Sequence, residues 1–251
     1  MADYDSEVLR GRSPAQARGA DIDAGLRSYM LRVYNYMAGG LAITGVIAYV
    51  AYTMAVVQTP QGLALSGFGQ FLFASPFKWL VMLAPLAIVF FLSFRVHKMS
   101  VPAAQATFWG YAALMGLSMA SIFLVFTGAS IFQVFLITAA SFGALSLWGY
   151  TTSKDISGWG SFLFMGLIGI VIASLVNIFL GSSALQFAIS VIGVLVFAGL
   201  TAYDTQQIKE MYYEGDSGEV ATKKSVMGAL RLYLDFINMF LMLLQLFGNR
   251  E

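Results

Sequence analysis

Seven apolar runs, each about 20 residues long, constrain the fold of this chain more than any other feature. A run of that length crosses the ~30 Å hydrocarbon core of a bilayer as a helix. The runs lie at roughly 33–57, 79–97, 105–127, 130–151, 160–180, 184–206 and 225–247. Because lipid-exposed backbone must satisfy its own hydrogen bonds, the sequence predicts an all-α integral membrane protein, a bundle of seven transmembrane helices.

Composition agrees with a polytopic membrane protein and excludes several functions. Hydrophobic residues make up 59% of the chain and charged residues 11%, whereas a soluble domain has about 25% charged residues. The net charge of +1 provides no basic patch for phosphates, so we expect no nucleic-acid partner. The chain has no cysteine and one histidine, His97, which excludes disulfides, thiolate chemistry and paired-histidine zinc motifs. We therefore expect neither a cofactor nor a bound metal.

The chain divides into a polar arm at 1–30 and a seven-helix transmembrane domain at 31–251. The arm carries charges of both signs, and we expect it to be cytoplasmic and either disordered or lying on the surface. The first apolar run is too long, and begins too far from the N-terminus, for a typical cleaved signal peptide.

Basic residues predict the orientation of the bundle. They cluster before the first span and in alternate connections, at Arg10, Arg12, Arg18, Arg27, Arg32, Arg95, Lys98, Lys154, Lys209, Lys223 and Lys224. Only Lys78 and Arg250 lie on the other side. The positive-inside rule then places the N-terminus in the cytoplasm and the C-terminus outside.

Two acidic residues, Asp204 and Asp235, fall within the last two spans. A charged side chain at the bilayer centre costs at least ~2.5 kcal/mol, so acids at this depth indicate a site that handles protons or cations. With a rise of 1.5 Å per residue, Asp204 lies roughly 13 Å from a helix end near residue 213. Asp235 lies roughly 20 Å along a helix that starts near residue 221. Two antiparallel neighbours would bring the two carboxylates to similar heights.

Polar residues on the last span share one helical stripe. Arg231, Asp235, Asn238 and Gln245 follow one another at steps of four, three and seven. This pattern indicates an inward-facing polar lining. The alternative is a structural ion pair between Arg231 and Asp235, which leaves Asp204 unexplained.

Paired carboxylates have a specific chemistry. Two acids held close together cannot both ionise cheaply, so they share a proton and change state at mildly acidic to neutral pH. A basic partner is then bound or released. Arg95, at the cytoplasmic end of the second span, is a candidate partner, and the alternative is an ordinary interfacial anchor. His97 is expected to be interfacial.

Several stretches resemble a known family. AGLTAYDTQQIKEMY and ALRLYLDFINMFLMLLQLFG closely resemble the last two helices of the Bax inhibitor-one family of transmembrane proteins. FLITAASFGALSLWGYTTSKDISGWGSFLFMGLIGIVIASLVNIFL is similar to its fourth and fifth helices, and LRVYNYMAGGLAITGVIAYVAYT to its first. The length suits the bacterial branch, which implies the cytoplasmic (inner) membrane.

The resemblance implies a seven-helix bundle in which a di-aspartyl pair senses pH and gates a calcium leak. Carried onto this chain, the pair is Asp204 of YDTQ and Asp235 of LYLDF, and the second-helix arginine that pairs with it is Arg95. Some relatives have an acid earlier in the second helix, but VMLAPLAIVFF has none. A bacterial subgroup is instead linked to a membrane-bound ATP-dependent protease.

Three functions follow from these observations. We predict a pH-sensitive calcium (cation) leak channel, closed when Arg95 or Arg231 bridges the ionised pair, with membrane lipid, protons and calcium as its partners. Here calcium is the transported ion. The alternative is a modulator and substrate of the protease, gripped by the N-terminal arm; deletion of residues 1–27 would abolish protease engagement and spare a leak. An intramembrane aspartyl protease is disfavoured, because Leu232-Tyr233-Leu234 replaces the Gly-x-Gly pattern before the second aspartate. We therefore expect the protein not to be an enzyme.

Overall fold

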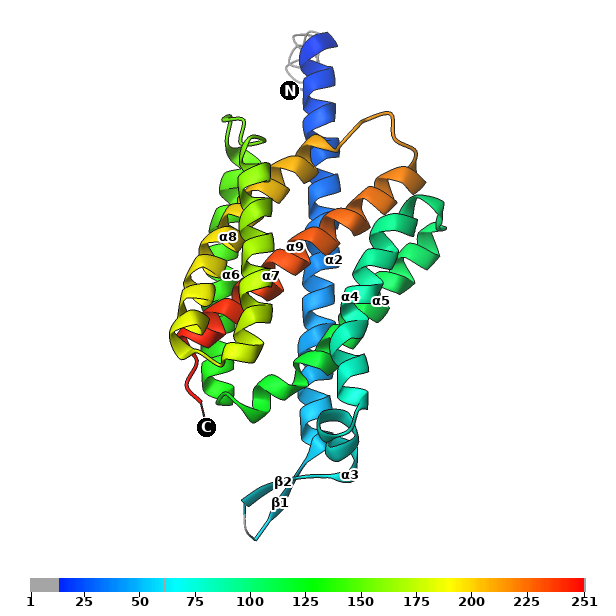
Figure 1. The fold of residues 1–251 in the computed structure, drawn as a ribbon. Coiled ribbons are helices and arrows are strands. Elements are labelled where there is room, and N and C mark those ends of the chain that lie inside the picture. The colour runs from blue at the N-terminus through cyan, green and yellow to red at the C-terminus, as the bar shows by residue number, and fades with distance from the viewer. Residues whose placement is uncertain (1–13, 61, 251) are drawn as a thin grey trace, which may run out of the picture.

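The computed structural model describes residues 14–60 and 62–250, and in this part of the chain seven helices are long and apolar enough to span a membrane (Figure 1). The spans are Ala24–Ala55, Phe77–Arg95, Val101–Leu124, Gly128–Thr151, Trp159–Leu180, Ser183–Glu210 and Gly218–Phe247. Each overlaps one of the predicted apolar runs. The predicted bundle of seven membrane-spanning helices is therefore confirmed.

These spans belong to seven labelled helices. They are α2 (Pro14–Ala55), α4 (Phe77–Arg95), α5 (Val101–Met119), α6 (Gly128–Thr151), α7 (Trp159–Leu180), α8 (Ser183–Glu210) and α9 (Gly218–Phe247). Tighter helical turns follow α4 at Val96–Lys98 and α5 at Ala120–Leu124.

Short polar side chains determine where four of these helices begin. Ser100, Thr127, Ser182 and Ser217 precede α5, α6, α8 and α9, and each hydroxyl accepts a hydrogen bond from a backbone N–H in the first turn. These bonds satisfy amides that a helix start would otherwise leave unpaired. At the other end of α7, Gly181 adopts a φ of +60°, which glycine tolerates, so α7 and α8 are joined by a tight turn.

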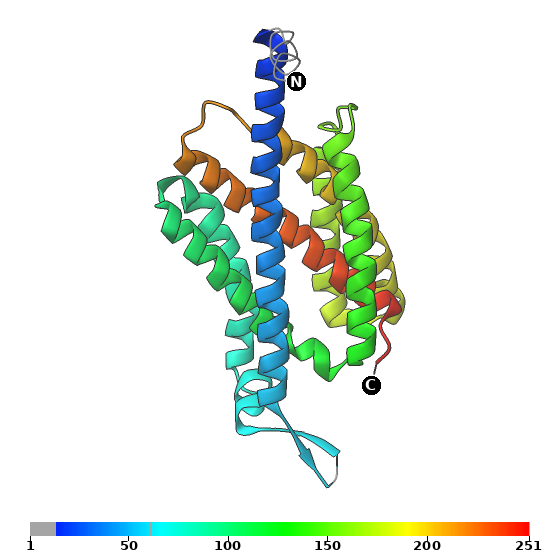
Figure 2. The same cartoon turned by 180° about the vertical axis from the view of Figure 1, so that it is seen from behind.

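The N-terminal half of α2 extends the first span. The helix begins at Pro14, so residues 14–30 of the predicted polar arm continue the span as helix, whereas residues 1–13 lie outside the described part of the chain. Alanine, the strongest helix former, is the most frequent residue in this stretch. In Figures 1 and 2 the start of α2 projects beyond the other helices.

The connection after α2 is ordered. Strand β1 (Val56–Thr59) pairs antiparallel with β2 (Gly62–Leu65), so the span ends at Ala55 rather than at residue 57. A short helix, α3 (Gly67–Gly69), and a π-helical turn at Gln70–Ala74 complete the connection. The hairpin lies at the opposite end of the bundle from the start of α2 (Figures 1 and 2).

The last helix, α9, is the central element of the bundle. In its most hydrophobic window 67% of residues are buried, against 17–33% in the other spans. It packs against α2, α5, α6 and α8, and it crosses the bundle obliquely in both ribbon views (Figures 1 and 2). Most of α9, including Asp235, is therefore surrounded by protein rather than lipid.

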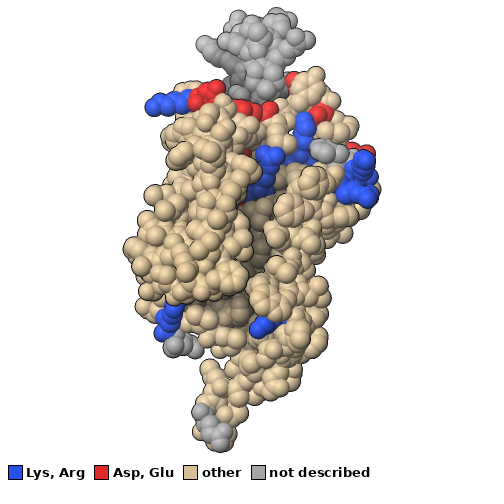
Figure 3. Space-filling model, viewed as in Figure 1, with Lys and Arg blue, Asp and Glu red and all other residues tan. Residues whose placement is uncertain are grey.

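On the face shown in Figure 3, charged side chains lie mainly near the top, with a few basic groups in the lower part, and a broad belt between them is uncharged. Large apolar side chains of the spans are exposed, including Leu86, Ile172 and Leu195, which are 55%, 56% and 67% exposed. An outward-facing apolar belt of this kind suits contact with the hydrocarbon of a bilayer.

Candidate functional site

The structure brings Asp204 and Asp235 together. Asp204 lies on α8 and Asp235 on α9, and these helices pack side by side. The two carboxyl groups are in hydrogen-bond contact. The antiparallel arrangement predicted from the sequence therefore places both acids at one height.

Asp235 depends on a shared proton for this contact. Its side chain is only 4% exposed, and among the described residues its Oδ2 atom has no partner that donates a hydrogen bond to it. Two carboxylates have no proton to share, so the contact is a hydrogen bond only when one of the two groups is protonated. The arrangement is thus suited to holding a single proton between α8 and α9.

Arg231 is the basic group beside the pair. It lies one turn before Asp235 on α9, and its charge acts on both carboxyl groups. Its side chain is exposed, and the ion pairs found among the described residues are Lys223–Glu219 and Lys224–Asp216, so Arg231 is not in contact with either acid. The purely local Arg231–Asp235 ion pair is therefore not formed in this structure.

A cavity of about 700 Å³ adjoins the pair. Asp204, Arg231, Asp235 and Asn238 line it, together with residues from the start of α7. Asn238 donates a hydrogen bond from Nδ2 to the carbonyl oxygen of Leu234, at 2.8 Å, which leaves its own carbonyl oxygen available. Three members of the predicted α9 stripe thus meet at one cavity.

The fourth member of the stripe, Gln245, lies in a separate polar cavity. This cavity has a volume of about 360 Å³ and is lined by Asn177, Gln186, Ser190 and Arg250 as well. Gln245 accepts a hydrogen bond from Arg250 at 3.2 Å. The stripe on α9 therefore has members at two separate cavities.

A small hydrophobic cluster separates these cavities. It consists of buried Ile170, Ile189 and Val196, with Met242 packed against them. Ile170 on α7, Val196 on α8 and Met242 on α9 fall between the residues that line the two cavities, whereas Ile189 lies beside Ser190 of the Gln245 cavity. The contact between α8 and α9 is close here, since a Cβ atom on Gly193 would lie 2.8 Å from Cγ of Met242. We call this cluster the hydrophobic plug.

Arg95 lies away from the pair in this structure. It is exposed at the end of α4, a helix that packs on α5, and it does not line the cavity with Asp204 and Asp235. Among the described residues it takes part in neither ion pair. Of the two predicted basic partners, the structure brings only Arg231 near the acids. The His97 side chain lies outside the described part.

Sequence reasoning missed the neighbours of Asp204 in the YDTQ motif. Gln206 of α8 is 5% exposed, and its side chain binds the backbone of the loop between α6 and α7. Its Oε1 accepts from the Ile156 N–H at 3.0 Å, and its Nε2 donates to the Lys154 carbonyl oxygen at 2.8 Å. The available signal was an amide side chain at a helix end, beside a loop whose backbone groups need partners.

Thr205 anchors a directed chain of hydrogen bonds through three helices. Its hydroxyl donates to the Thr201 carbonyl oxygen at 2.7 Å, so the Ser146 hydroxyl donates to Thr205 at 2.9 Å. The Tyr34 hydroxyl in turn donates to Ser146 at 2.7 Å. The helix that carries Asp204 is thereby connected through α6 to α2.

Tyr233 fixes the opposite side of α9. Its hydroxyl donates to Thr44 Oγ1 on α2 at 2.6 Å, because Thr44 uses its own proton on the Ala112 carbonyl oxygen of α5 at 2.8 Å. Tyr233 precedes Asp235 by two positions, so the two side chains point to different sides of the helix.

The chemistry of the site then rests on two carboxyl groups and one guanidinium, since no cluster of three or more His, Cys, Asp or Glu occurs among the described residues.

Comparisons with known proteins match nearly the whole chain. A family model described as "Inhibitor of apoptosis-promoting Bax1" matches residues 26–251, a range that includes both aspartates. Inner membrane protein YbhL of Escherichia coli strain K12 is 48% identical over 231 residues, which are 91% of this chain and 94% of YbhL. Protein RP147 of Rickettsia prowazekii is 46% identical over 235 residues, covering 94% of this chain and 95% of RP147. Membrane protein SpyM3_0260 of Streptococcus pyogenes is 37% identical over 230 residues, covering 91% and 96%.

Proposed function

Because the chain belongs to the Bax inhibitor-1 family of multi-pass membrane proteins, we propose that it is a pH-sensitive leak channel for calcium and related cations. The gate in this proposal is the Asp204–Asp235 pair. The observation that carries it is the hydrogen-bond contact between two carboxyl groups at a cavity inside a membrane-spanning bundle. Acids at such depth are expensive to keep, which favours a functional role over a structural one.

The proposed gate works through the charge of the pair. When the shared proton leaves, two negative charges face each other, and Arg231 is the nearby cation that can bridge them. The bridge holds α8 against α9 and keeps the channel closed. Protonation releases Arg231, as in the present structure, where Arg231 touches neither acid and the hydrophobic plug is still packed. Without the bridge, α8 and α9 separate more readily, so the leak increases as the pH falls.

The proposed pathway follows α7, α8 and α9. Calcium prefers oxygen ligands, and the two cavities offer carboxylate, amide and hydroxyl oxygens from Asp204, Asp235, Asn238, Gln245 and Ser190. The hydrophobic plug interrupts this path in the present structure. A hydrophobic constriction closes a channel because water leaves it readily. Separation of α8 from α9 at Gly193 and Met242 would open it.

The membrane and orientation complete the proposal. We place the protein in the bacterial cytoplasmic membrane, with the N-terminus in the cytoplasm and the C-terminus outside. The basic residues support this orientation, since the connection at 152–158, which contains Lys154, and the one at 211–217, which lies between Lys209 and Lys223, are at the same end of the bundle as the start of α2 (Figure 1). The aspartate pair then responds to cytoplasmic pH.

Calcium flux into proteoliposomes tests the proposal directly. Purified protein is reconstituted, and uptake of calcium is recorded at pH 6 and pH 8 beside empty liposomes. The proposal expects uptake above that of empty liposomes, and more of it at pH 6. Uptake equal to that of empty liposomes at both pH values would contradict it.

A second candidate function is suggested by the projecting start of α2. The helix begins at Pro14, whereas its candidate span begins at Ala24, so a helical segment precedes the membrane. A membrane-bound ATP-dependent protease that modulates or degrades this protein would need such a segment to engage. Deletion of residues 1–23 keeps the span intact. On this reading it abolishes capture by the protease and leaves calcium flux unchanged.

A further inference from the structure

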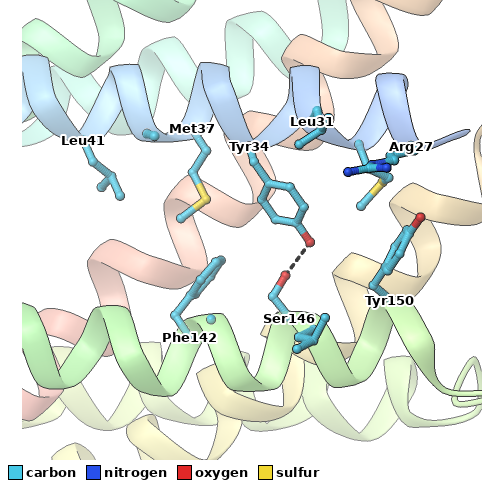
Figure 4. Close-up of a pocket in the computed structure, with 12 residues that line it drawn as sticks. Arg27, Leu31, Tyr34, Met37, Leu41, Phe142, Ser146 and Tyr150 are labelled. Atoms are coloured by element: carbon cyan, nitrogen blue, oxygen red, sulfur yellow. Dashed lines mark hydrogen bonds between the residues drawn. The ribbon is translucent and has the colours of Figure 1, made fainter. Parts of the chain in front are cut away.

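An apolar cleft of about 490 Å³ lies between α2 and α6 (Figure 4). It is distinct from the aspartate cavity, with which it shares no lining residue. Its walls are mainly hydrophobic, including Leu31, Met37 and Leu41 of α2 and Phe142 and Leu147 of α6. Figure 4 shows Met37, Leu41 and Phe142 projecting into the gap between the two helices.

The cleft opens toward the bilayer. Leu31 and Leu147 at its edge are 51% and 62% exposed, and both lie within candidate membrane spans. From Arg27 to Leu41 the cleft follows α2 for about 21 Å, given a rise of 1.5 Å per residue. That is longer than half of the ~30 Å hydrocarbon core. A lipid chain from one leaflet would therefore fit along it.

One end of the cleft is basic. Arg27 and Tyr150 lie together at the end opposite Leu41 (Figure 4). Lys209 adds a second cation there, since its Nζ donates to the Tyr150 carbonyl oxygen at 2.9 Å and lies 5.5 Å from the centre of the Tyr150 ring. Arg27 forms no ion pair with any side chain that the structure describes. An apolar cleft that ends at a guanidinium is complementary to an anionic amphiphile.

We propose that this cleft binds one acyl chain of an anionic phospholipid, with the phosphate of the lipid held by Arg27. The bilayer supplies such lipids at high concentration, and basic groups near the membrane surface attract anionic headgroups. The acyl chain lies along Met37, Leu41 and Phe142. A free phosphate would use only the basic end and leave the apolar walls unfilled.

The bound lipid also acts on the helix that carries Asp204, a consequence that rests on the proposed function. The Tyr34 ring lines the cleft, and its hydroxyl begins the chain of hydrogen bonds through Ser146 to Thr205. Thr205 is next to Asp204. An acyl chain against Tyr34 therefore keeps α2, α6 and α8 in register, and its loss shifts the pH at which the pair responds.

Native mass spectrometry of the purified full-length chain tests the binding. The probes are phosphatidylglycerol, which is anionic, and phosphatidylcholine, which is zwitterionic. Gly143→Leu fills the cleft, because a Cβ atom on Gly143 meets nothing within 4 Å and the larger side chain has room to enter. It should weaken retention of both lipids about tenfold, a factor reached by losing about two methylene contacts. Arg27→Ala should weaken phosphatidylglycerol about fivefold and leave phosphatidylcholine unchanged.

Two matched variants control for general effects. Gly110→Leu makes the same substitution on α5, where a Cβ atom also meets nothing within 4 Å, outside the cleft. Arg32→Ala removes the same charge from α2 at a residue that instead donates to Thr222 of α9. Both should bind lipid as the wild type does. Equal binding by Gly143→Leu and Gly110→Leu, or by Arg27→Ala and Arg32→Ala, would overturn the proposal.

A flux measurement separates this proposal from the leak itself. In phosphatidylglycerol liposomes, Gly143→Leu should shift the pH response of calcium uptake, whereas Gly110→Leu should not. If the wild type shows no calcium uptake in liposomes of phosphatidylglycerol or of phosphatidylcholine, the leak proposal fails, and the binding measurement still decides the lipid site. If binding is lost in Gly143→Leu and the pH response is unchanged, the coupling through Tyr34 is wrong.

Discussion

The carboxyl groups of Asp204 and Asp235 are in hydrogen-bond contact across the interface of α8 and α9. Such a contact requires one proton for two acids, so the interface itself depends on protonation. Arg231 stands beside the pair without touching it. The same two helices, together with α7, form the hydrophobic plug, so the proton and the closed part of the proposed pathway share the interface of α8 and α9.

Replacement of Arg231 by glutamine should weaken the closed state. Without the guanidinium, the ionised pair has no cation to bridge it, and calcium uptake at pH 8 should rise a little over tenfold, as expected for a charge pair worth ~1.5 kcal/mol. Arg95→Gln is the matched control, because Arg95 is exposed at the end of α4 and away from the cavity. Uptake is measured in proteoliposomes at pH 8. An effect of Arg95→Gln equal to that of Arg231→Gln would show that Arg231 is not the specific partner.

Truncation of the plug should open the channel independently of pH. Met242 packs against Gly193 between the two polar cavities, so Met242→Ala removes the side chain that fills this gap. Calcium uptake should rise at both pH 6 and pH 8, and the free energy of unfolding should fall by about 2 kcal/mol, the lower end for a large-to-alanine change. Phe247→Ala, at a residue 63% exposed on the same helix, should change neither. Unaltered calcium uptake in Met242→Ala would show that the pathway does not pass Met242.

Loss of the hydroxyl should affect the stability of the protein differently at two buried tyrosines, Tyr233 and Tyr111. Tyr233→Phe removes the donor to Thr44 at 2.6 Å and should lower the free energy of unfolding by about 1 kcal/mol. The Tyr111 hydroxyl is buried and without a hydrogen-bond partner among the described residues, so Tyr111→Phe should be neutral or stabilising. Thermal unfolding of both variants in detergent compares them. A greater loss of stability in Tyr111→Phe would contradict this assignment of hydrogen bonds.

The sequence predicts much of this arrangement because membrane-spanning helices have two simple sequence patterns, the length of their apolar runs and the helical spacing of their polar residues. The length of the apolar runs predicted the spans, and the helical spacing of polar residues predicted that Arg231, Asp235 and Asn238 share one side of α9, where they line one cavity. The order of the helices in space is not encoded in such patterns, so the sequence did not show that α9 is central or that Arg95 lies away from the pair. The partners of Gln206 and Thr205 likewise come from α6 and its loop, more than 45 residues away in the sequence.

Gln206 should prove important for stability. Gln206→Ala leaves the Ile156 N–H and the Lys154 carbonyl oxygen without their partners, at a cost of about 1–3 kcal/mol. The neighbouring change, Gln207→Ala, removes only an exposed contact with Glu210 and should cost less than about 0.5 kcal/mol. Thermal unfolding measures both. Equal shifts would mean that the loop between α6 and α7 does not depend on Gln206.

Asp155 provides a control for the pH measurements. Hydrogen bonds from the Ser157 hydroxyl and from the Ser157 N–H, the latter at 2.9 Å, hold the pKa of Asp155 below its usual value. A lowered pKa in the folded state adds stability above the unfolded pKa, and this is lost only as the pH falls through the folded pKa. Asp155 therefore stays ionised between pH 6 and 8. Asp155→Asn should leave the pH response of the leak unchanged.

The most direct test of the shared proton is calcium uptake between pH 6 and 8 in Asp204→Asn, Asp235→Asn, the double variant and the Asp155→Asn control. Each single variant removes one half of the same proton site, so each should abolish the pH dependence, and the double variant should add nothing further. Asp155→Asn should follow the wild type. Additive effects of the two single variants, or a pH dependence that survives in either, would contradict a gate built on one proton shared by Asp204 and Asp235.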